Sequence, residues 1–228
     1  YNTTMSDYNP NYLDFEKPLL EIDNKIKAIK TSASASQKDI NKIESLNKEL
    51  DKNISKIFSS LSDWQISQIA RHPLRPYTLD YISNMFTNFI EIHGDRMFGD
   101  DKAIICGLAN IENESVMLIG HQKGRDSMDK VFRNFGMPKP EGYRKALRAM
   151  KLAEKFNIPI LTFIDTPGAY PGIDAESRNQ SIAIADNLYQ MSKIKCPIIS
   201  VVIGEGGSGG ALAIGVADKL AMLQYSIS

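Results

Sequence analysis

The last third of the chain alternates short apolar runs with helical segments, and this alternation constrains the fold more than any other feature. Residues 159–164 and 197–203 are continuous apolar runs of strand length, and a third strand begins at Leu220. Helical patterns occupy 176–194 and, approximately, 209–219. Strands that are apolar on both faces and separated by helices usually pair in parallel within an α/β core. The sequence therefore predicts an α/β fold.

Two further strands and a helix precede this region. Residues 103–109 and 115–119 are apolar, and the polar residues 112–114 between them predict a hairpin. A helix is expected from Gly142 to about Phe156. The two strands add to the predicted sheet, and the helix connects them to the strand at 159–164.

The N-terminal part has a helical pattern instead. Apolar residues recur at steps of three and four through 13–61, and the Ser-rich run 31–36 interrupts them, which predicts a helical hairpin. Ser62 and Gln65 have the spacing of a capping box that begins a short helix. Thr78 is expected to cap a further helix.

The helix that begins at Thr78 is predicted to run to about Ile92 and to stop at Gly94. We therefore divide the chain into a disordered segment, 1–12, an N-terminal helical extension, 13–92, and a core, 93–228. The core ends on a strand, which indicates that part of the fold is missing.

Composition narrows the classes of protein. The 228 residues include 27 basic and 27 acidic side chains, and this balance argues against binding through a strong global charge to nucleic acid or anionic lipid. Cys106 and Cys196 form no Cys-x-x-Cys pair, which argues against a disulfide scaffold and a self-contained zinc site. We expect a cytoplasmic protein with no metal in this chain and no membrane-spanning segment.

A glycine-rich loop, GEGGSGG at 204–210, follows the second buried strand. Glycines leave the backbone open to a ligand, and the first N–H groups of a helix have no intrahelical acceptor. The loop also matches the dinucleotide fingerprint, but no acidic residue lies about twenty positions later. It matches a nucleophile elbow around Ser208, but no His follows. It is not a P-loop, since no Lys-Ser/Thr follows the glycines. A backbone site for an anion, either an oxyanion or a phosphate, remains.

A second loop, DTPGAYPG at 165–172, follows the first buried strand and should lie at the same edge of the sheet. Basic residues near 120–144, including Lys123 and Arg125, could meet a phosphate-rich ligand or an acidic partner, or form ordinary surface ion pairs. His121 fits a structural role better than that of a general base.

Motifs along most of the chain carry a resemblance to a known family. They are LDFEKP at 13–18, RHP at 71–73, RP at 75–76, TLDY at 78–81, HGDR at 93–96, GHQKG at 120–124, RNFG at 133–136, PEGYRKALR at 140–148, FIDTPGAYPG at 163–172 and VIGEGGSGGAL at 202–212. In these residues the chain resembles the α subunits of bacterial acetyl-CoA carboxylase carboxyltransferases. The resemblance covers residue 13 to the end.

The resemblance implies a crotonase-like (ClpP/crotonase) fold of ββα repeats. It implies transfer of a carboxyl group from carboxybiotin, held on a biotin carboxyl carrier protein, to acetyl-CoA, which gives malonyl-CoA for fatty acid synthesis. It also implies a zinc-containing β subunit in an α2β2 assembly, with biotin carboxylase supplying the ATP-dependent step of the complex.

The same resemblance suggests roles for individual residues. Backbone N–H groups of the glycine loop would stabilise negative charge on biotin, with Gly209 and Gly210 favoured over Gly206 and Gly207 because they open the helix. The remaining expected contacts are to substrate, and Tyr170 would pack in the wall of a biotin pocket. The residues expected to contact substrate are Pro167, Gly168, Ala169, Tyr170, Pro171, Gly172, Lys123 and Arg125. Ser208 would not act as a nucleophile.

Overall fold

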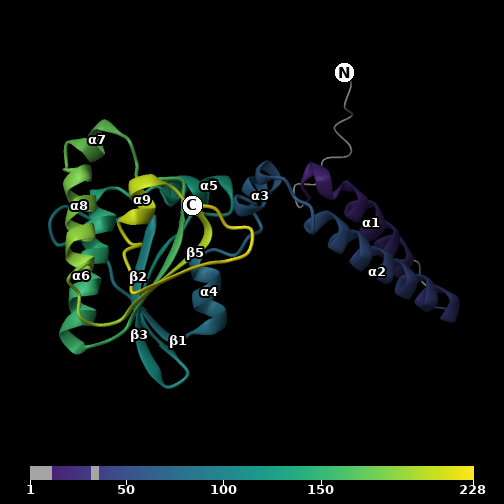
Figure 1. Ribbon diagram of the computed structural model, residues 1–228, viewed down its shortest axis with the longest axis horizontal. Helices are drawn as coiled ribbons and strands as arrows, with labels where there is room; N and C mark the ends of the chain where they lie inside the picture. The colour runs from purple at the N-terminus through teal and green to yellow at the C-terminus, as the bar shows by residue number, and fades with distance from the viewer. Residues whose placement is uncertain (1–11, 32–35) are drawn as a thin grey trace. The chain divides into compact units, whose positions relative to one another are not determined.

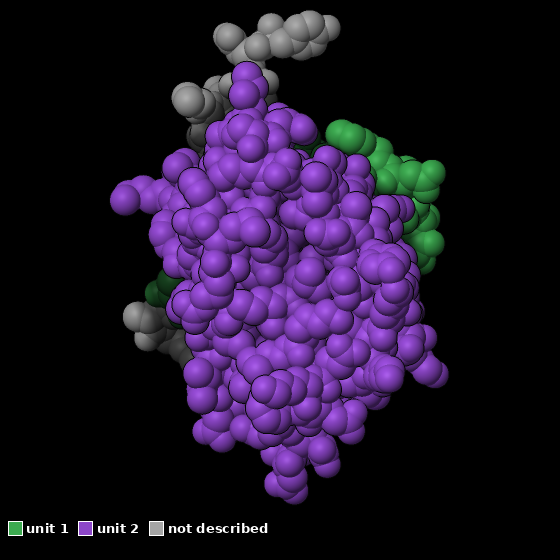
Figure 2. Space-filling model, turned by 90° about the vertical axis from the view of Figure 1, so that its left-hand side faces the viewer, with its two compact units in different colours: residues 1–68 green, residues 69–228 purple. Residues whose placement is uncertain are grey.

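The structure is a computed structural model that describes residues 12–31 and 36–228. The described chain divides into two compact units between Gln68 and Ile69. Figure 2 shows the second unit in purple. This unit includes residues 69–92, which the sequence pattern predicts as part of the helical extension. The predicted disordered segment lies, apart from Tyr12, outside the described residues, as does most of the Ser-rich break.

The first unit is built around the predicted helical hairpin. Its elements are η2 (Asp14–Glu16), α1 (Lys17–Thr31) and α2 (Gln37–Phe58). Helix α1 buries Leu19, Ile22 and Ile26, whose spacing places them on one helix face, and α2 packs against α1. The interpretation of 13–61 as two amphipathic helices is thus confirmed for the described residues.

Helix α3 (Asp63–Ala70) begins at the predicted capping box. The Ser62 N–H donates to Gln65 Oε1 at 2.8 Å, and the Gln65 N–H donates to Ser62 Oγ at 3.3 Å. Each residue therefore satisfies a backbone donor of the other at the start of the helix.

The second unit contains one sheet with the strand order β1-β2-β3-β4-β5-β6 (Figure 1). The strands are β1 (Thr87–Glu91), β2 (Ile104–Ile111), β3 (Glu114–His121), β4 (Ile160–Thr166), β5 (Ile198–Gly206) and β6 (Lys219–Met222). Strands β1 to β3 pair antiparallel, and β3 to β6 pair in parallel. The hairpin and the parallel strands match the sequence prediction.

The helices of this unit lie on both faces of the sheet (Figure 1). They are α4 (Thr78–Met85), α5 (Ser127–Phe132), η3 (Asn134–Gly136), α6 (Pro140–Phe156), α7 (Ile173–Glu176), α8 (Gln180–Met191) and α9 (Ser208–Leu212). Helices α6 and α8 pack beside each other on one face, and α4 packs on the other.

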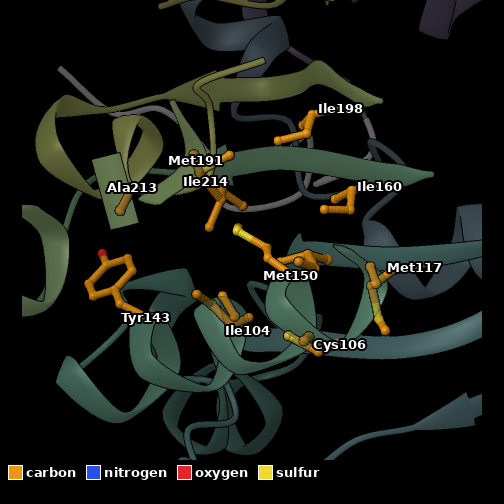
Figure 3. Packing of buried hydrophobic residues seen from close by; sticks show 14 of the residues in the cluster. Ile104, Cys106, Met117, Tyr143, Met150, Ile160, Met191, Ile198, Ala213 and Ile214 are labelled. Atoms are coloured by element: carbon orange, nitrogen blue, oxygen red, sulfur yellow. The ribbon is translucent and has the colours of Figure 1, made fainter. Parts of the chain in front are cut away.

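Successive side chains along each strand point to opposite faces of the sheet, so the core is divided into two clusters, one on each face. Ile104, Cys106 and Met117 point into the cluster with Met150 of α6, as Figure 3 shows. Ile105, between the first two, belongs to the cluster beneath α4. Because helices cover both faces, the central strands are apolar at successive positions.

The structure corrects the prediction for residues 78–92. Helix α4 ends at Met85, and 87–91 form strand β1 instead of a continued helix. Thr78 is not the N-cap, which is Tyr77; the Tyr77 N–H donates to Asp80 Oδ2 at 2.7 Å. The Thr78 hydroxyl instead donates to the His121 carbonyl at 2.5 Å and ties α4 to β3. Tertiary pairing therefore overrides the local helical pattern.

Two later helices are also shorter than predicted. The segment 176–194 is interrupted before α8 by Asn179, which has a left-handed backbone with φ of 67°. Helix α9 ends at Leu212 and does not reach residue 219. Asp218 is held at the start of β5, where it accepts from the Ile198 N–H at 2.8 Å and donates its own N–H to the Ile198 carbonyl at 3.0 Å. Among the helices in the described ranges, none combines the length and the apolar character required to cross a bilayer.

Candidate functional site

The two predicted loops meet at the carboxyl ends of β4 and β5. A Cβ atom on Gly210 would lie 2.6 Å from the Gly168 carbonyl carbon and 2.7 Å from the Ala169 nitrogen. A Cβ on Gly207 would lie 2.2 Å from the Pro167 carbonyl oxygen. Backbone therefore packs directly on backbone, and only glycine fits at these two positions.

The backbone N–H groups of the glycine loop fall into two sets. The Gly206 N–H donates to the Ile227 carbonyl at 2.7 Å, and the Gly207 N–H donates to the Thr166 carbonyl at 2.8 Å. Within residues 12–31 and 36–228, the N–H groups of Gly209 and Gly210 have no hydrogen-bond acceptor. They lie in the first turn of α9, where such groups carry partial positive charge.

The facing loop offers a further donor. The Gly168 N–H donates to Thr166 Oγ1 at 3.0 Å, and the Tyr170 N–H donates to the Pro138 carbonyl at 3.0 Å. The Ala169 N–H between them has no acceptor in the described chain, and its nitrogen is the atom that a Cβ on Gly210 would meet. Unpaired donors from both loops therefore lie close together.

Tyr170 belongs to the facing loop, and both its ring and its carbonyl have partners. Its ring lies 4.9 Å from the Lys139 Nζ, and its carbonyl accepts from Gln180 Nε2 at 2.9 Å. A Cβ on Gly172 would lie 2.2 Å from Tyr170 Cε1, so the ring folds back over this glycine. Pro167 and Pro171 are exposed.

A cluster of charged side chains includes Glu205 of the glycine loop and was not predicted as a unit. Lys123 Nζ lies 2.8 Å from Asp165 Oδ1 and 2.6 Å from Glu205 Oε1. Arg71 Nε lies 2.6 Å from Glu205 Oε2. Burial raises the pKa of Asp165 despite the charge on Lys123. Burial also opposes ionisation of Glu205, but hydrogen bonds from Lys123 and Arg71 outweigh it and lower its pKa. The sequence feature that points to this cluster is a carboxylate just after each of two apolar runs, Asp165 after 159–164 and Glu205 after 197–203.

The structure gives protein partners to both basic residues that were predicted to bind substrate. Lys123 lies in the charged cluster, and Arg125 pairs with Asp80, donates to the Pro73 carbonyl at 2.6 Å and stacks 4.5 Å over the Tyr77 ring. Their predicted contacts with substrate stay predictions.

A cavity of about 170 Å³ adjoins this cluster. It is lined by Arg71, Pro73, Tyr77, Lys123, Gly124, Lys130, Phe135 and Glu205. Its lining includes none of the residues 206–210, so the cavity is distinct from the unpaired N–H groups of the glycine loop.

His121 is a core residue. Burial, together with the charge on Lys123, lowers its pKa to about 3, so the imidazole is neutral. Its Nδ1 accepts from the Asp165 N–H at 3.3 Å. Ser208 is exposed, and no hydrogen bond joins it to a His in the described residues. Its φ of 51° places a non-glycine residue in the left-handed region. This arrangement lacks the base that a serine nucleophile needs.

No three or more His, Cys, Asp and Glu side chains among the described residues are grouped so that they could hold a metal ion. The candidate site consists of backbone donors at two loop–strand junctions and of the charged cluster beside them.

Comparison with known proteins gives one consistent result. A family model described as acetyl co-enzyme A carboxylase carboxyltransferase-like matches residues 12–228. The acetyl-coenzyme A carboxylase carboxyl transferase subunit alpha of Dichelobacter nodosus is 61% identical over 220 residues, which are 96% of this chain and 69% of that protein. The same subunit of Vesicomyosocius okutanii is 63% identical over 224 residues, covering 96% of this chain and 70% of its own.

Solved structures share the fold at lower identity. Transcarboxylase 12S, solved with methylmalonyl-coenzyme A bound, has a TM-score of 0.53 and 23% identity over 63% of this chain and 27% of its own. A single-chain, multi-domain long-chain acyl-CoA carboxylase has a TM-score of 0.52 and 20% identity over 65% of this chain and 15% of its own. The chain therefore contains the crotonase-like fold of carboxyltransferases.

Proposed function

Because the chain belongs to the acetyl-CoA carboxylase carboxyltransferase family, as an alpha subunit, we propose that it carries the biotin side of the reaction. In this proposal a carboxyl group passes from carboxybiotin, held on a biotin carboxyl carrier protein, to acetyl-CoA, and malonyl-CoA enters fatty acid synthesis. A zinc-containing β subunit completes an α2β2 assembly, to which biotin carboxylase delivers the carboxylated carrier. We expect this assembly to act in the cytoplasm.

The chemistry requires a place for negative charge. Carboxybiotin, when bound, supplies the carboxyl group and leaves negative charge on its ureido oxygen. We assign the stabilisation of that charge to the Gly209 and Gly210 N–H groups, with the Ala169 N–H as a third donor from the facing loop. Removal of one such donor costs about 10²–10³ in rate in enzymes where mutagenesis has tested it.

This assignment rests on which backbone N–H groups of the glycine loop already have an acceptor within the protein. Gly206 and Gly207 use their N–H groups inside the fold, whereas Gly209 and Gly210 have theirs unpaired among the described residues. A backbone hydrogen-bond donor left without an acceptor is costly unless water or a ligand satisfies it. Ordered donors of this kind need no reorganisation when charge develops beside them.

The surrounding residues support the same proposal. Tyr170 lies next to the unpaired Ala169 N–H, with Lys139 Nζ over its ring and its carbonyl bonded to Gln180, and we assign it to the wall of the biotin pocket. Ser208 has no hydrogen bond to a His among the residues that the structure describes, and a backbone oxyanion site needs no protein nucleophile.

The experiment is co-expression of the chain with a carboxyltransferase β subunit, followed by an assay of malonyl-CoA decarboxylation with free biotin. We expect saturable dependence on biotin and no activity from either subunit alone. Decarboxylation that is independent of biotin would contradict the proposal. Tight binding of NAD or GTP by the isolated chain would instead favour a nucleotide-binding module without catalysis of its own.

A further inference from the structure

The strand that leads into the glycine loop contains a bulge. Strands β4 and β5 pair regularly as far as Ile164 and Val202, and pairing resumes at Thr166 and Gly206. Between these pairs, β4 contributes one residue and β5 contributes residues 203–205. The backbone of β5 therefore bends immediately before the segment that supplies the unpaired N–H groups.

The single residue of β4 opposite the bulge is Asp165, and its side chain takes the place of the missing backbone acceptor. The Glu205 N–H donates to Asp165 Oδ1 at 3.0 Å. A Cβ on Gly204 would lie 2.3 Å from the same oxygen, so the carboxylate occupies the space that a side chain at Gly204 would fill. The backbone returns to regular pairing at Gly207, whose N–H donates to the Thr166 carbonyl.

Charge neutralisation keeps this carboxylate in place. The side chains of Asp165 and Glu205 are 2% and 8% exposed, and Lys123, at 13%, lies between them. A buried carboxylate is tolerated when it is paired and hydrogen-bonded. Lys123 supplies one partner to each carboxylate, and Arg71 supplies a second to Glu205.

We propose that Asp165, held by Lys123, is a positioning residue that fixes the β5 bulge and so directs the Gly209 and Gly210 N–H groups toward the reacting centre. Bulges commonly change the direction of a strand beside an active site. This inference rests on the proposed function for its catalytic consequence, whereas the bulge itself can be tested without activity.

The test compares Asp165→Asn with Asp165→Ala in the assembled complex. Asparagine keeps an oxygen that can accept from the Glu205 N–H, whereas alanine removes it. Because a misplacement of about 1 Å can cost about 10²-fold, we expect Asp165→Ala to lower kcat about 10²-fold with little change in KM for malonyl-CoA. We expect Asp165→Asn to restore most of kcat, to within about tenfold of the parent.

The matched control is Asp95→Ala. Asp95 is also a buried carboxylate, and its Oδ1 accepts from the Met97, Phe98 and Gly99 N–H groups, but it lies outside the glycine loop and the charged cluster. We expect this variant to lose stability and to keep the kcat of its folded fraction.

A structural readout separates this inference from the proposed function. Amide hydrogen exchange at Glu205 should become about ten- to a hundredfold faster in Asp165→Ala, since a hydrogen bond to a charged acceptor is lost. It should change little in Asp165→Asn. Should Asp165→Ala fail to fold, Gly204→Ala displaces the carboxylate and should give the same faster exchange and lower kcat.

The inference is overturned if Glu205 exchange stays slow in Asp165→Ala, or if kcat stays at the parent value while exchange accelerates. It is also overturned if Asp165→Asn loses as much kcat as Asp165→Ala. If the assembled complex shows no carboxyl transfer at all, the proposed function fails, while the exchange data still decide whether Asp165 holds the bulge.

Discussion

A single methyl group added at Gly210 tests how closely the two loops must pack. The new Cβ would meet backbone atoms of Gly168 and Ala169 at 2.6 and 2.7 Å, and no rotamer change can move these aside. To reach 3.4 Å, where ordinary contact begins, the facing loop must retreat by about 0.8 Å. A displacement near 1 Å costs about 10²-fold in rate. We therefore expect Gly210→Ala to lower kcat about 10²-fold and to destabilise the fold by roughly 1–3 kcal/mol through overpacking.

The assay is malonyl-CoA decarboxylation with free biotin by the chain assembled with its β subunit, paired with a urea melt. Gly99→Ala is the matched control, because a Cβ there has no neighbour within 4 Å and Gly99 does not have a positive φ. We expect the control to keep its activity and stability. A Gly210→Ala complex with full kcat would show that the two loops can separate without loss of catalysis, contrary to the close packing argued from the structure.

Three further substitutions test other parts of the structure. Ser208→Ala should change kcat by no more than about threefold, which is less than about 1 kcal/mol of activation free energy, because no described residue is a base hydrogen-bonded to the Ser208 hydroxyl; a well-folded variant without activity would revive a serine nucleophile. The pKa of His121 falls from 6.5 to about 3 on folding, so below pH 6.5 the unfolded chain takes up a proton that the folded chain does not. The contribution of His121 to the free energy of unfolding should therefore fall by about 2 kcal/mol between pH 7 and pH 5. His121→Asn should remove that part of the pH dependence in urea melts. An unchanged pH dependence in the variant would contradict a neutral buried imidazole. Lys145 is fully buried, and its Nζ lies 2.7 Å from Asp100 Oδ1 and donates to the Asp101 carbonyl at 2.6 Å. Lys145→Ala should therefore cost about 2–5 kcal/mol through the cavity it leaves and the lost hydrogen bonds, although Asp100 keeps its ion pair with Lys102; a loss below about 1 kcal/mol by the same melts would show that the buried Lys145 side chain is dispensable.

The parallel part of the sheet was predictable because its cause is local. Continuous apolar runs at 159–164 and 197–203 indicate strands covered on both faces, and the structure has β4 and β5 there. Strand β1 was not predictable in the same way. Its residues continue a helical pattern from Thr78, and only pairing with β2 decides that 87–91 extend. Local propensity is a weak prior where a neighbouring strand can take up the backbone hydrogen bonds.

The candidate site shows the same division. Glycine spacing and strand ends were sufficient to predict that 165–172 and 204–210 lie together. The sequence could not distinguish Gly206 and Gly207 from Gly209 and Gly210 by hydrogen bonding, because the acceptors that occupy the first pair come from Ile227 and Thr166. The link among Lys123, Asp165 and Glu205 was not predicted either, because two carboxylates at strand ends give no strand register, and the register shifts between Ile164 and Thr166.

The most direct test of the account is an amide spectrum of the chain labelled with ¹⁵N-glycine and assembled with unlabelled β subunit. On addition of free biotin we predict downfield shifts of the Gly209 and Gly210 amide protons, because these donors gain an acceptor. The Gly206 and Gly207 amides already have backbone acceptors and should move little. Shifts confined to Gly206 and Gly207, or no shift in the loop at biotin concentrations that saturate activity, would contradict a backbone oxyanion site at the start of α9.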